Sequence, residues 1–313
     1  MVLLEAPIDL STAISMQFGW YQVLHTDAAI YLPRLAGRQV LIRMYHPNVM
    51  SLSPDDWARQ TSDFVNAWGG AITDITPANE LNLAVEHGDQ DGYWQTPDGY
   101  AEINTWLYNF AQAFRPMQPQ IRLHWPALAF GHNEDGPNFV GYEICRPSID
   151  LYDVLDIHAY WFSDNQFSGW ERYYYAYRWD RPPDFNPAFS GGARYLFPGK
   201  QLFISEFGAP SSLSRRANQY KSFYSDLDSR PYILGSTSFV WSAAPWKWPE
   251  LQWVNDRGLI NTILAWLKGI KPPVDVTALL VGAMAGAIIG YYLFVYRPKV
   301  RSRPAAVSRP VLA

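Results

Sequence analysis

Two glutamates end apolar, strand-like segments that lie far apart in the 313-residue chain. Glu80 closes "AITDITPANE" (71–80), and Glu206 lies in "QLFISEFG" (201–208). Two carboxyl groups that flank a bound sugar can cleave a glycosidic bond, one as the acid and the other as nucleophile or base. Glu206 directly follows "LFIS", where a buried unpaired carboxylate would be costly, so a functional role is favoured. Glu80 has a plainer alternative as a solvated carboxylate at the start of "LNLAVEHG".

A histidine and a tyrosine alternate along "DVLDIHAYW" (153–161). Alternation places His158 and Tyr160 on one face of a strand, although a purely structural histidine is also consistent with this pattern. His124, His132 and His158 lack a metal-binding spacing such as His-Glu-x-x-His, so we predict no metal. We also predict no cofactor, because no Gly-rich phosphate loop is present. A Gly-x-Ser-x-Gly elbow is missing too, which argues against a serine hydrolase.

The segments that must position these side chains alternate between strand-like and helix-like patterns. Strands are predicted at 18–25, 39–46, 71–80, 121–130, 153–161, 201–208 and 233–242. Helices are predicted at 8–16, 27–35, 53–68, 96–114, 214–227 and 259–270. Such alternation indicates an α/β fold with a parallel sheet, either doubly wound or closed into a barrel. In a barrel, the carboxyl ends of the strands meet on one face, which would bring the two glutamates together.

The motifs and their order resemble the clan A glycoside hydrolases, a superfamily of retaining (β/α)8 TIM-type barrels. "PANE" (77–80) matches the family's Asn-Glu pair at the end of the fourth strand. The resemblance implies that Glu80 is the acid/base and that Asn79 holds the 2-hydroxyl of the sugar. "ISEFG" (204–208) matches the nucleophile motif of the seventh strand, which implies that role for Glu206.

Two further motifs extend the resemblance over roughly residues 9–270. "DIHAYW" (156–161) matches the sixth strand, which implies that Tyr160 contacts the nucleophile and that His158 lines the cleft. "FVWS" (239–242) matches the eighth strand, which implies that Trp241 floors the sugar site. Arg43 is a candidate cationic partner of the nucleophile. If a first strand precedes residue 18, the strand of Arg43 (39–46) is the third of the barrel, whereas the family has this cation on the second. His46, at the end of the same strand, is a further candidate to line the cleft.

A complete barrel needs eight strands, and only seven are evident. The first strand is therefore either absent, compressed into "VLLEA" (2–6), or lost upstream together with a signal peptide. The amino terminus does not read as a signal peptide, because Glu5 and Asp9 interrupt its short apolar run. One missing segment upstream would explain both observations.

Composition excludes several other classes of protein. The net charge of −4 argues against a general nucleic-acid binder. The single Cys145 excludes a disulfide framework or a cysteine metal cluster within one chain. The 14 Trp, 20 Tyr and 16 Phe residues suit stacking on sugar rings, or equally a large aromatic core.

The carboxyl-terminal part predicts a single membrane anchor. The uncharged stretch 276–296 has the length of about 20 residues that spans a bilayer. It follows the barrel (1–270) and a short linker (271–275), and a basic, disordered tail (297–313) comes after it. The excess of basic residues in the tail predicts a cytoplasmic tail and an extracytoplasmic barrel. Helix pairing through the anchor is a weaker prediction, from small residues spaced by four: Gly282, Gly286 and Gly290.

These observations predict a retaining glycosidase that cleaves a β-linked sugar by double displacement. A nucleophile must be ionised, so we expect a cation or hydrogen-bond donors beside Glu206. An acid must carry its proton, so we expect Glu80 to be buried or close to the negative Glu206. The alternative is a membrane-anchored barrel that binds glycan or protein without catalysis. Whether water or a second sugar accepts the glycosyl group is left open.

Overall fold

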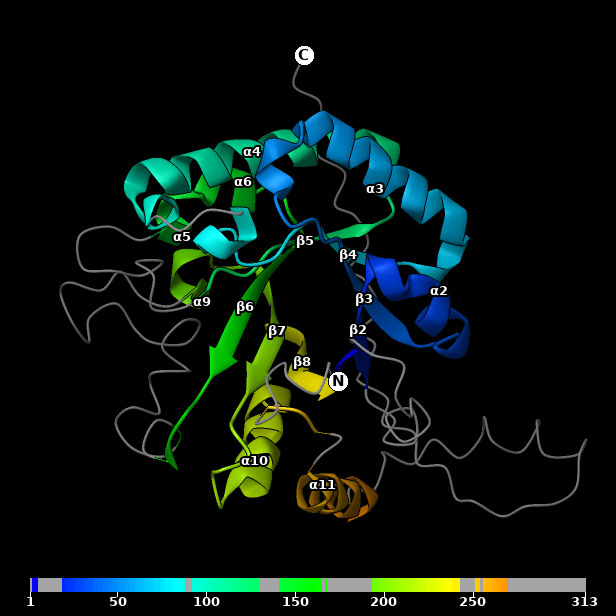
Figure 1. Cartoon of the computed structure of the whole chain (residues 1–313), viewed down its shortest axis with the longest axis vertical. Helices are drawn as coiled ribbons and strands as arrows, with labels where there is room; N and C mark the ends of the chain where they lie inside the picture. Colours follow the sequence, from blue (N-terminus) through cyan, green and yellow to red (C-terminus); the bar gives the residue numbers. More distant parts are fainter. Residues whose placement is uncertain are drawn as a thin grey trace, which may run out of the picture.

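The computed structural model describes residues 2–4, 19–87, 92–129, 141–164, 167, 193–242, 251–253 and 256–269. These residues form a closed barrel of eight parallel strands that neighbour one another in sequence order (Figure 1). The strands are β1 (Val2–Leu4), β2 (Trp20–Leu24), β3 (Gln39–Arg43), β4 (Asp74–Thr76), β5 (Arg122–Trp125), β6 (Val154–Tyr160), β7 (Gln201–Gly208) and β8 (Ile233–Ser242). The predicted (β/α)8-type barrel is confirmed.

The barrel is closed by the short strand β1. Leu3 pairs with Gln22 of β2, and Val2 pairs with Ser238 of β8, both in parallel register. The first strand therefore lies inside "VLLEA", the second of the three alternatives that the sequence left open. Three residues are too few to show a strand pattern in the sequence. The predicted helix at 8–16 lies outside the described residues.

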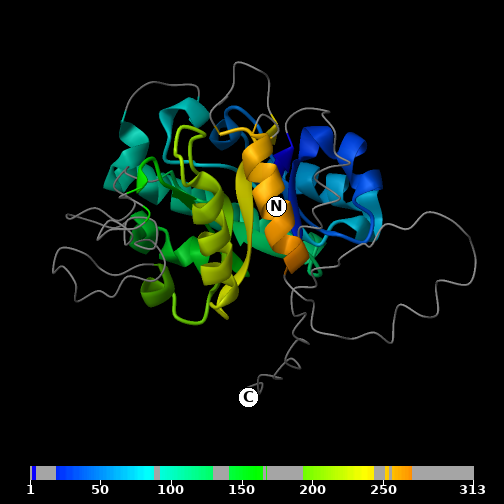
Figure 2. The same ribbon diagram turned by 90° about the horizontal axis from the view of Figure 1, so that it is seen from below.

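Helices surround the strands. The α-helices are α2 (Ala28–Tyr31), α3 (Pro54–Trp68), α4 (Pro97–Met117), α5 (Gly141–Ile144), α6 (Arg146–Ile149), α9 (Ala193–Leu196), α10 (Arg216–Asp228) and α11 (Arg257–Gly269). Short 3-10 helices are η1 (His25–Asp27), η2 (Leu32–Arg34), η3 (Val49–Ser51), η4 (Gly69–Ala71), η5 (Ala84–His87) and η6 (Tyr93–Gln95). Helices α3 and α4 pack against each other, as do α10 and α11, which lie side by side in Figure 2.

The long helices begin where the sequence predicted. Pro54 occupies the first turn of α3, where a missing N–H has no intrahelical partner to lose. Thr96 caps α4 by accepting a hydrogen bond of 3.2 Å from the Gly99 amide. Buried side chains along α3 and α4, such as Trp57 and Phe110, then face the strands.

Several strands are shorter than predicted. β3 ends at Arg43, so His46, predicted at its end, lies beyond the strand. Two other strands stop at a proline. β4 ends at Thr76, immediately before Pro77, and β5 ends at Trp125, immediately before Pro126. Proline has no N–H to donate to a neighbouring strand, so it ends the pairing at both positions. The prediction that a strand runs as far as Glu80 was therefore wrong, and Glu80 lies in the loop after β4.

A buried polar network crosses the inside of the barrel below the strand ends. His124 on β5 contacts Asp74 of β4 at 2.9 Å and Asp156 of β6 at 2.7 Å. Arg122 adds a hydrogen bond of 3.0 Å to Asp74. Burial would lower the pKa of His124, but the two carboxylates outweigh burial and raise it to about 9. The network ties three neighbouring strands together.

The predicted membrane segment is not part of the described structure. Residues 276–296, the linker 271–275 and the tail 297–313 all lie outside the described residues, as do Gly282, Gly286 and Gly290. Within the part that is described, no helix is long and apolar enough to cross a bilayer.

Candidate active site

Glu206 lies on β7 with its carboxylate turned into the barrel, and only 5% of the residue is exposed. Arg43, the last residue of β3, donates a hydrogen bond from Nη1 to Oε1. The Tyr160 hydroxyl, at the end of β6, donates to Oε2 at 2.6 Å. Each oxygen of the carboxylate thus has a donor, as expected for a group that must stay ionised. Both donors come from residues that the sequence had singled out.

The electrostatics favour a negative Glu206. Burial would raise the pKa of its carboxyl group, but the neighbouring His158 and Arg43 and the hydrogen bonds outweigh burial and lower the pKa. Burial and the charge of Glu206 raise the pKa of Tyr160 well above its ordinary value. The tyrosine therefore keeps its proton and remains a donor.

The guanidinium of Arg43 is itself held by a residue that the sequence analysis missed. Gln22 on β2 lies beside it, and when its amide is oriented so that both ends are satisfied, the oxygen accepts from Nε at 2.7 Å and from Nη2 at 2.5 Å. In this orientation the amide nitrogen donates to the carbonyl of Ser205 at 2.6 Å and to Thr237 at 2.9 Å. The sequence does show a glutamine within the apolar strand "WYQVL", and the structure buries it. Its role could not be predicted because the arginine that it holds lies on another strand.

Glu80 approaches from the loop after β4, and its side chain is 19% exposed. Its backbone N–H donates to the carbonyl of Ala127 at 3.1 Å. Its φ of 33° lies in the left-handed region, the single such case among non-glycine residues in the described ranges. Strain of this kind persists where the surrounding structure fixes the backbone, and it clusters at functional sites.

His158 lies between the two carboxylates. Its Nδ1 is 2.7 Å from Oε1 of Glu80 and 3.7 Å from Oε2 of Glu206. One carboxylate oxygen of Glu80, one of Glu206 and one ring nitrogen of His158 all lie within 4.8 Å of one another. Three such groups are in principle able to hold a metal ion, but the buried Arg43 beside Glu206 already supplies a positive charge and disfavours a cation there.

Comparisons by sequence give no match, either to a protein-family model or to a curated protein. Comparisons of structure do. An endo-β-1,3-glucanase of GH128 subgroup II from Sorangium cellulosum aligns with a TM-score of 0.56 at 14% identity, over 83% of this chain and 94% of the glucanase. A subgroup I endo-β-1,3-glucanase from Amycolatopsis mediterranei, in complex with laminaritriose, aligns with a TM-score of 0.53 at 14% identity, over 84% and 97%. A calcium-binding mutant of β-glucuronidase 2 from Bacteroides uniformis aligns with a TM-score of 0.54 at 13% identity, over 80% of this chain and 32% of that protein.

The chain has the barrel fold of these glycoside hydrolases. At such low identity the likeness concerns the fold. It agrees with the barrel that the sequence motifs implied.

Asn79 and a third carboxyl group complete the described surroundings of Glu80. Asn79 donates from Nδ2 to Oε1 of Glu86 at 3.3 Å. Burial raises the pKa of Glu86, and its final value is about 7. Glu86 lies in the segment "LNLAVEHG" after Glu80 and was not among the residues singled out from the sequence. Only the packing of η5 back onto the loop brings its carboxyl group next to Asn79.

The other two predicted residues are less closely tied to the carboxylates. The His46 ring lies 6.0 Å from the ring of Trp57 on α3, and its Nδ1 accepts a hydrogen bond from the amide of Asn48. Within the described residues no contact joins His46 to either glutamate. Trp241 lies on β8 as predicted, but its side chain is outside the described part of the chain.

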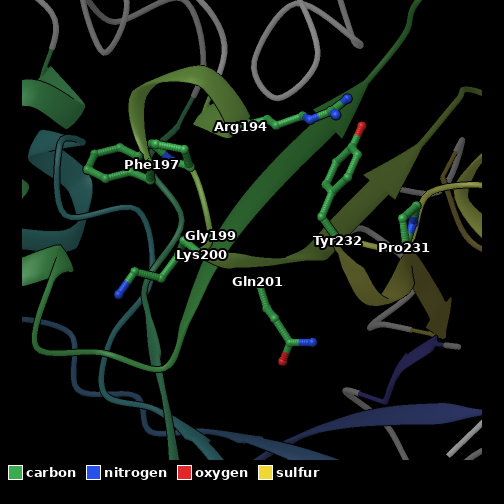
Figure 3. A pocket seen from close by; sticks show the side chains of 8 residues that line it. Arg194, Phe197, Gly199, Lys200, Gln201, Pro231 and Tyr232 are labelled. Atoms are coloured by element: carbon green, nitrogen blue, oxygen red, sulfur yellow. The ribbon is translucent and has the colours of Figure 1, made fainter. Parts of the chain in front are cut away.

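A separate cavity of about 470 Å³ lies at the opposite end of β7 and β8, where these strands begin (Figure 3). Arg194 and Tyr232 lie next to each other on one side of it, with the guanidinium carbon 4.5 Å from the ring centre. Lys200 nearby donates to two backbone carbonyls, so its ammonium group is already engaged. The cavity is therefore distinct from the carboxylate pair.

Proposed function

We propose that this chain is a retaining O-glycoside hydrolase that cleaves a β-linked sugar, with Glu206 as nucleophile and Glu80 as acid/base. The observation that carries the proposal is the spacing of the two carboxyl groups, which bring oxygens within 4.8 Å of each other. Retaining enzymes have carboxyl groups about 5–5.5 Å apart, whereas inverting enzymes leave about 6.5–9.5 Å for a water. Oxygens this close support the retaining arrangement and leave little room for an intervening water.

The surroundings suit the two roles. Glu206, held ionised by Arg43 and Tyr160, would attack the anomeric carbon while Glu80 gives its proton to the leaving oxygen. Glu80 is more exposed than Glu206, so its carboxyl group is accessible to a leaving group. Water would then release the sugar from Glu206, with Glu80 taking up the proton. His158, bonded to Glu80, would hold the acid in place between the two steps.

The substrate class is a further part of the proposal. Two of the similar structures are endo-β-1,3-glucanases, so oligosaccharides of β-1,3-linked glucose are the first substrates to test. A β-glucuronidase of similar fold makes aryl β-glucuronides a second choice. Laminaripentaose and a panel of aryl β-glycosides together cover both classes.

The test combines turnover with covalent labelling. We expect the wild type to cleave at least one of these substrates with retention, seen as the β-anomer of the first product by NMR. A 2-deoxy-2-fluoro glycoside of the matching sugar should modify Glu206, located by mass spectrometry of peptides. Glu206→Gln should lose turnover and labelling, and Glu80→Gln should lose about 10²–10⁴-fold in kcat.

Glu143→Gln on α5 provides a matched control, because Glu143 is exposed and far along the chain from both carboxylates. It should keep wild-type activity. If the two active-site variants behave like this control on a substrate that the wild type cleaves, the assignment is wrong. A chain that binds laminaripentaose but neither cleaves it nor accepts the label would instead be a binding barrel.

We also propose that residues 276–296 anchor the barrel to a membrane, with the barrel extracytoplasmic. The uncharged length of this stretch and the basic residues that follow it support the proposal. The full chain should remain with membranes after alkaline carbonate washing and be released by detergent. External protease should digest the barrel in intact cells and leave the tail protected. Recovery of the chain in the carbonate wash would overturn the anchor.

A further inference from the structure

The loop after β4 brings a third carboxyl group, that of Glu86, next to the residue that precedes the acid/base. The Leu83 amide donates to the Glu80 carbonyl at 2.8 Å, and the Glu86 amide donates to the Leu83 carbonyl at 3.0 Å. These two turns reverse the chain. Asn79 and Glu86, seven positions apart, then meet side chain to side chain at 3.3 Å.

This part of the loop is held by specific contacts and is not a free surface segment. The Asn82 amide group donates to the carbonyl of Ala129 at 2.8 Å and accepts from the amide of Ala129 at 2.7 Å. The ring of His87 contacts the carbonyl of Leu81 at 2.6 Å through Nε2. Buried hydrogen bonds on both sides of Glu86 therefore fix where its carboxyl group lies.

The contact determines which way the Asn79 amide faces. An ionised carboxylate only accepts hydrogen bonds, so it selects the Nδ2 side of the amide. Oδ1 then faces away from Glu86, and it has no protein partner among the described residues. An amide oxygen that accepts from none of the described residues and lies next to the acid/base is suited to accept a hydrogen bond from a sugar hydroxyl.

We propose that Glu86 is a positioning residue that fixes the Asn79 amide so that Oδ1 accepts a hydrogen bond from a substrate hydroxyl beside Glu80. This inference rests on the proposed glycosidase function. Glu86 would be a further residue of that site, and it would influence the substrate only through Asn79.

The charges around Glu86 make this orientation depend on pH. Burial raises its pKa most, the bond from Asn79 lowers it, the Glu80 charge raises it, and the result is about 7. Two groups on other elements act more weakly: Arg43 of β3 lowers the pKa, and Glu206 of β7 raises it. Above about pH 7 the carboxylate selects Nδ2. Below it, a protonated Glu86 can donate to Oδ1, so the amide can turn and present Nδ2 to the substrate.

The first experiment measures kcat/KM for laminaripentaose from pH 6 to pH 8 in the full-length protein. Glu86→Gln keeps the size of the side chain, but its amide can pair with either end of Asn79 and does not titrate. We expect about a fivefold loss at pH 8, the size of one hydrogen bond, and little loss at pH 6. In an Asn79→Ala background the same substitution should have no further effect. Glu143→Gln should follow the wild type at every pH.

The second experiment does not depend on turnover. The side-chain NH₂ of Asn79, labelled with ¹⁵N and assigned from its loss in Asn79→Ala, should shift with a midpoint near pH 7. The shift should disappear in Glu86→Gln. If wild type is active and Glu86→Gln keeps its pH profile, or if the Asn79 signal does not titrate, the positioning role is overturned. Absence of any cleavage or labelling, together with a normal Asn79 titration, would instead overturn the proposed glycosidase and leave the Glu86–Asn79 coupling standing.

Discussion

The Tyr160 hydroxyl donates a hydrogen bond of 2.6 Å to Oε2 of Glu206. The two residues lie on neighbouring strands, and β6 and β7 are paired with a register shift between Ile157 and His158. The shift aligns His158 with Glu206 and Tyr160 with Gly208. The tyrosine ring can therefore reach back over the carboxylate from the residue two positions beyond His158.

Removing this hydroxyl should make Glu206 harder to ionise. The bond from Tyr160 is one of the interactions that lower the pKa of Glu206 against the effect of burial. A hydrogen bond to a charged group contributes about 1.5 kcal/mol, which corresponds to about one pKa unit. Tyr160→Phe should therefore move the acidic limb of kcat/KM upward by about one pH unit.

The same variant should be more sensitive to acid. Because the folded pKa of Glu206 is lowered, its contribution to stability is present above the unfolded pKa and is lost as the pH falls through the folded value. Tyr160→Phe brings that loss to a higher pH, which acid titration of the unfolding midpoint would show. Tyr108→Phe, an exposed tyrosine on α4, is the matched control. An unchanged acidic limb in Tyr160→Phe would contradict the argument.

Arg43 and Glu206 should be strongly coupled in stability. Both side chains are about 95% buried, so removing one partner leaves the other charge without compensation. Arg43→Met should lower the free energy of unfolding by about 3–5 kcal/mol in the wild type. In a Glu206→Gln background, Arg43→Met should lower the free energy of unfolding by clearly less, because the buried carboxylate that Arg43 compensates is already absent. Urea unfolding of the four proteins measures the coupling, and equal costs in both backgrounds would refute it.

The inner network should make stability fall on the alkaline side. The pKa of His124 is raised to about 9, so its contribution is complete below the unfolded value of about 6.5. That contribution is lost as the pH rises from about 6.5 through about 9, by about 3 kcal/mol. His124→Gln should be less stable at pH 6 but should show a flatter profile from pH 6.5 to 9.5. Parallel profiles of the two proteins would show that His124 does not titrate in this range.

The sequence predicted the parts of this site that depend on one strand at a time. Glu206 was found because an apolar strand delivers it directly, and Tyr160 and His158 because they alternate on β6. Gln22 was missed because its role depends on contacts with β3, β7 and β8, which only the closed barrel brings together. Glu86 was missed for a similar reason, since η5 must fold back before it touches Asn79. The predicted strand 71–80 was longer than β4 because the apolar pattern continues past Pro77, where strand pairing stops.

The backbone of Glu80 offers a test of strain in the loop after β4. Its φ of 33° is unfavourable for any residue with a Cβ and costs about 1 kcal/mol or more, whereas glycine adopts it freely. Glu80→Ala and Glu80→Gly both remove the carboxyl group and its bond to His158, so the difference between them isolates the strain. We expect both variants to lose activity and the glycine variant to be more stable by about 1 kcal/mol.

A control pair on a regular helix should show the reverse order. Glu102 lies inside α4, where glycine is less stable than alanine by about 1 kcal/mol. Thermal and urea unfolding of all four variants gives the comparison. The Glu80 pair could instead behave like the Glu102 pair, with the alanine variant more stable than the glycine variant by a similar free energy of unfolding. That result would show that the loop after β4 relaxes out of the left-handed conformation once the carboxylate is gone. In that case the bond between Glu80 and His158, and not the surrounding loop, holds Glu80 in its strained conformation.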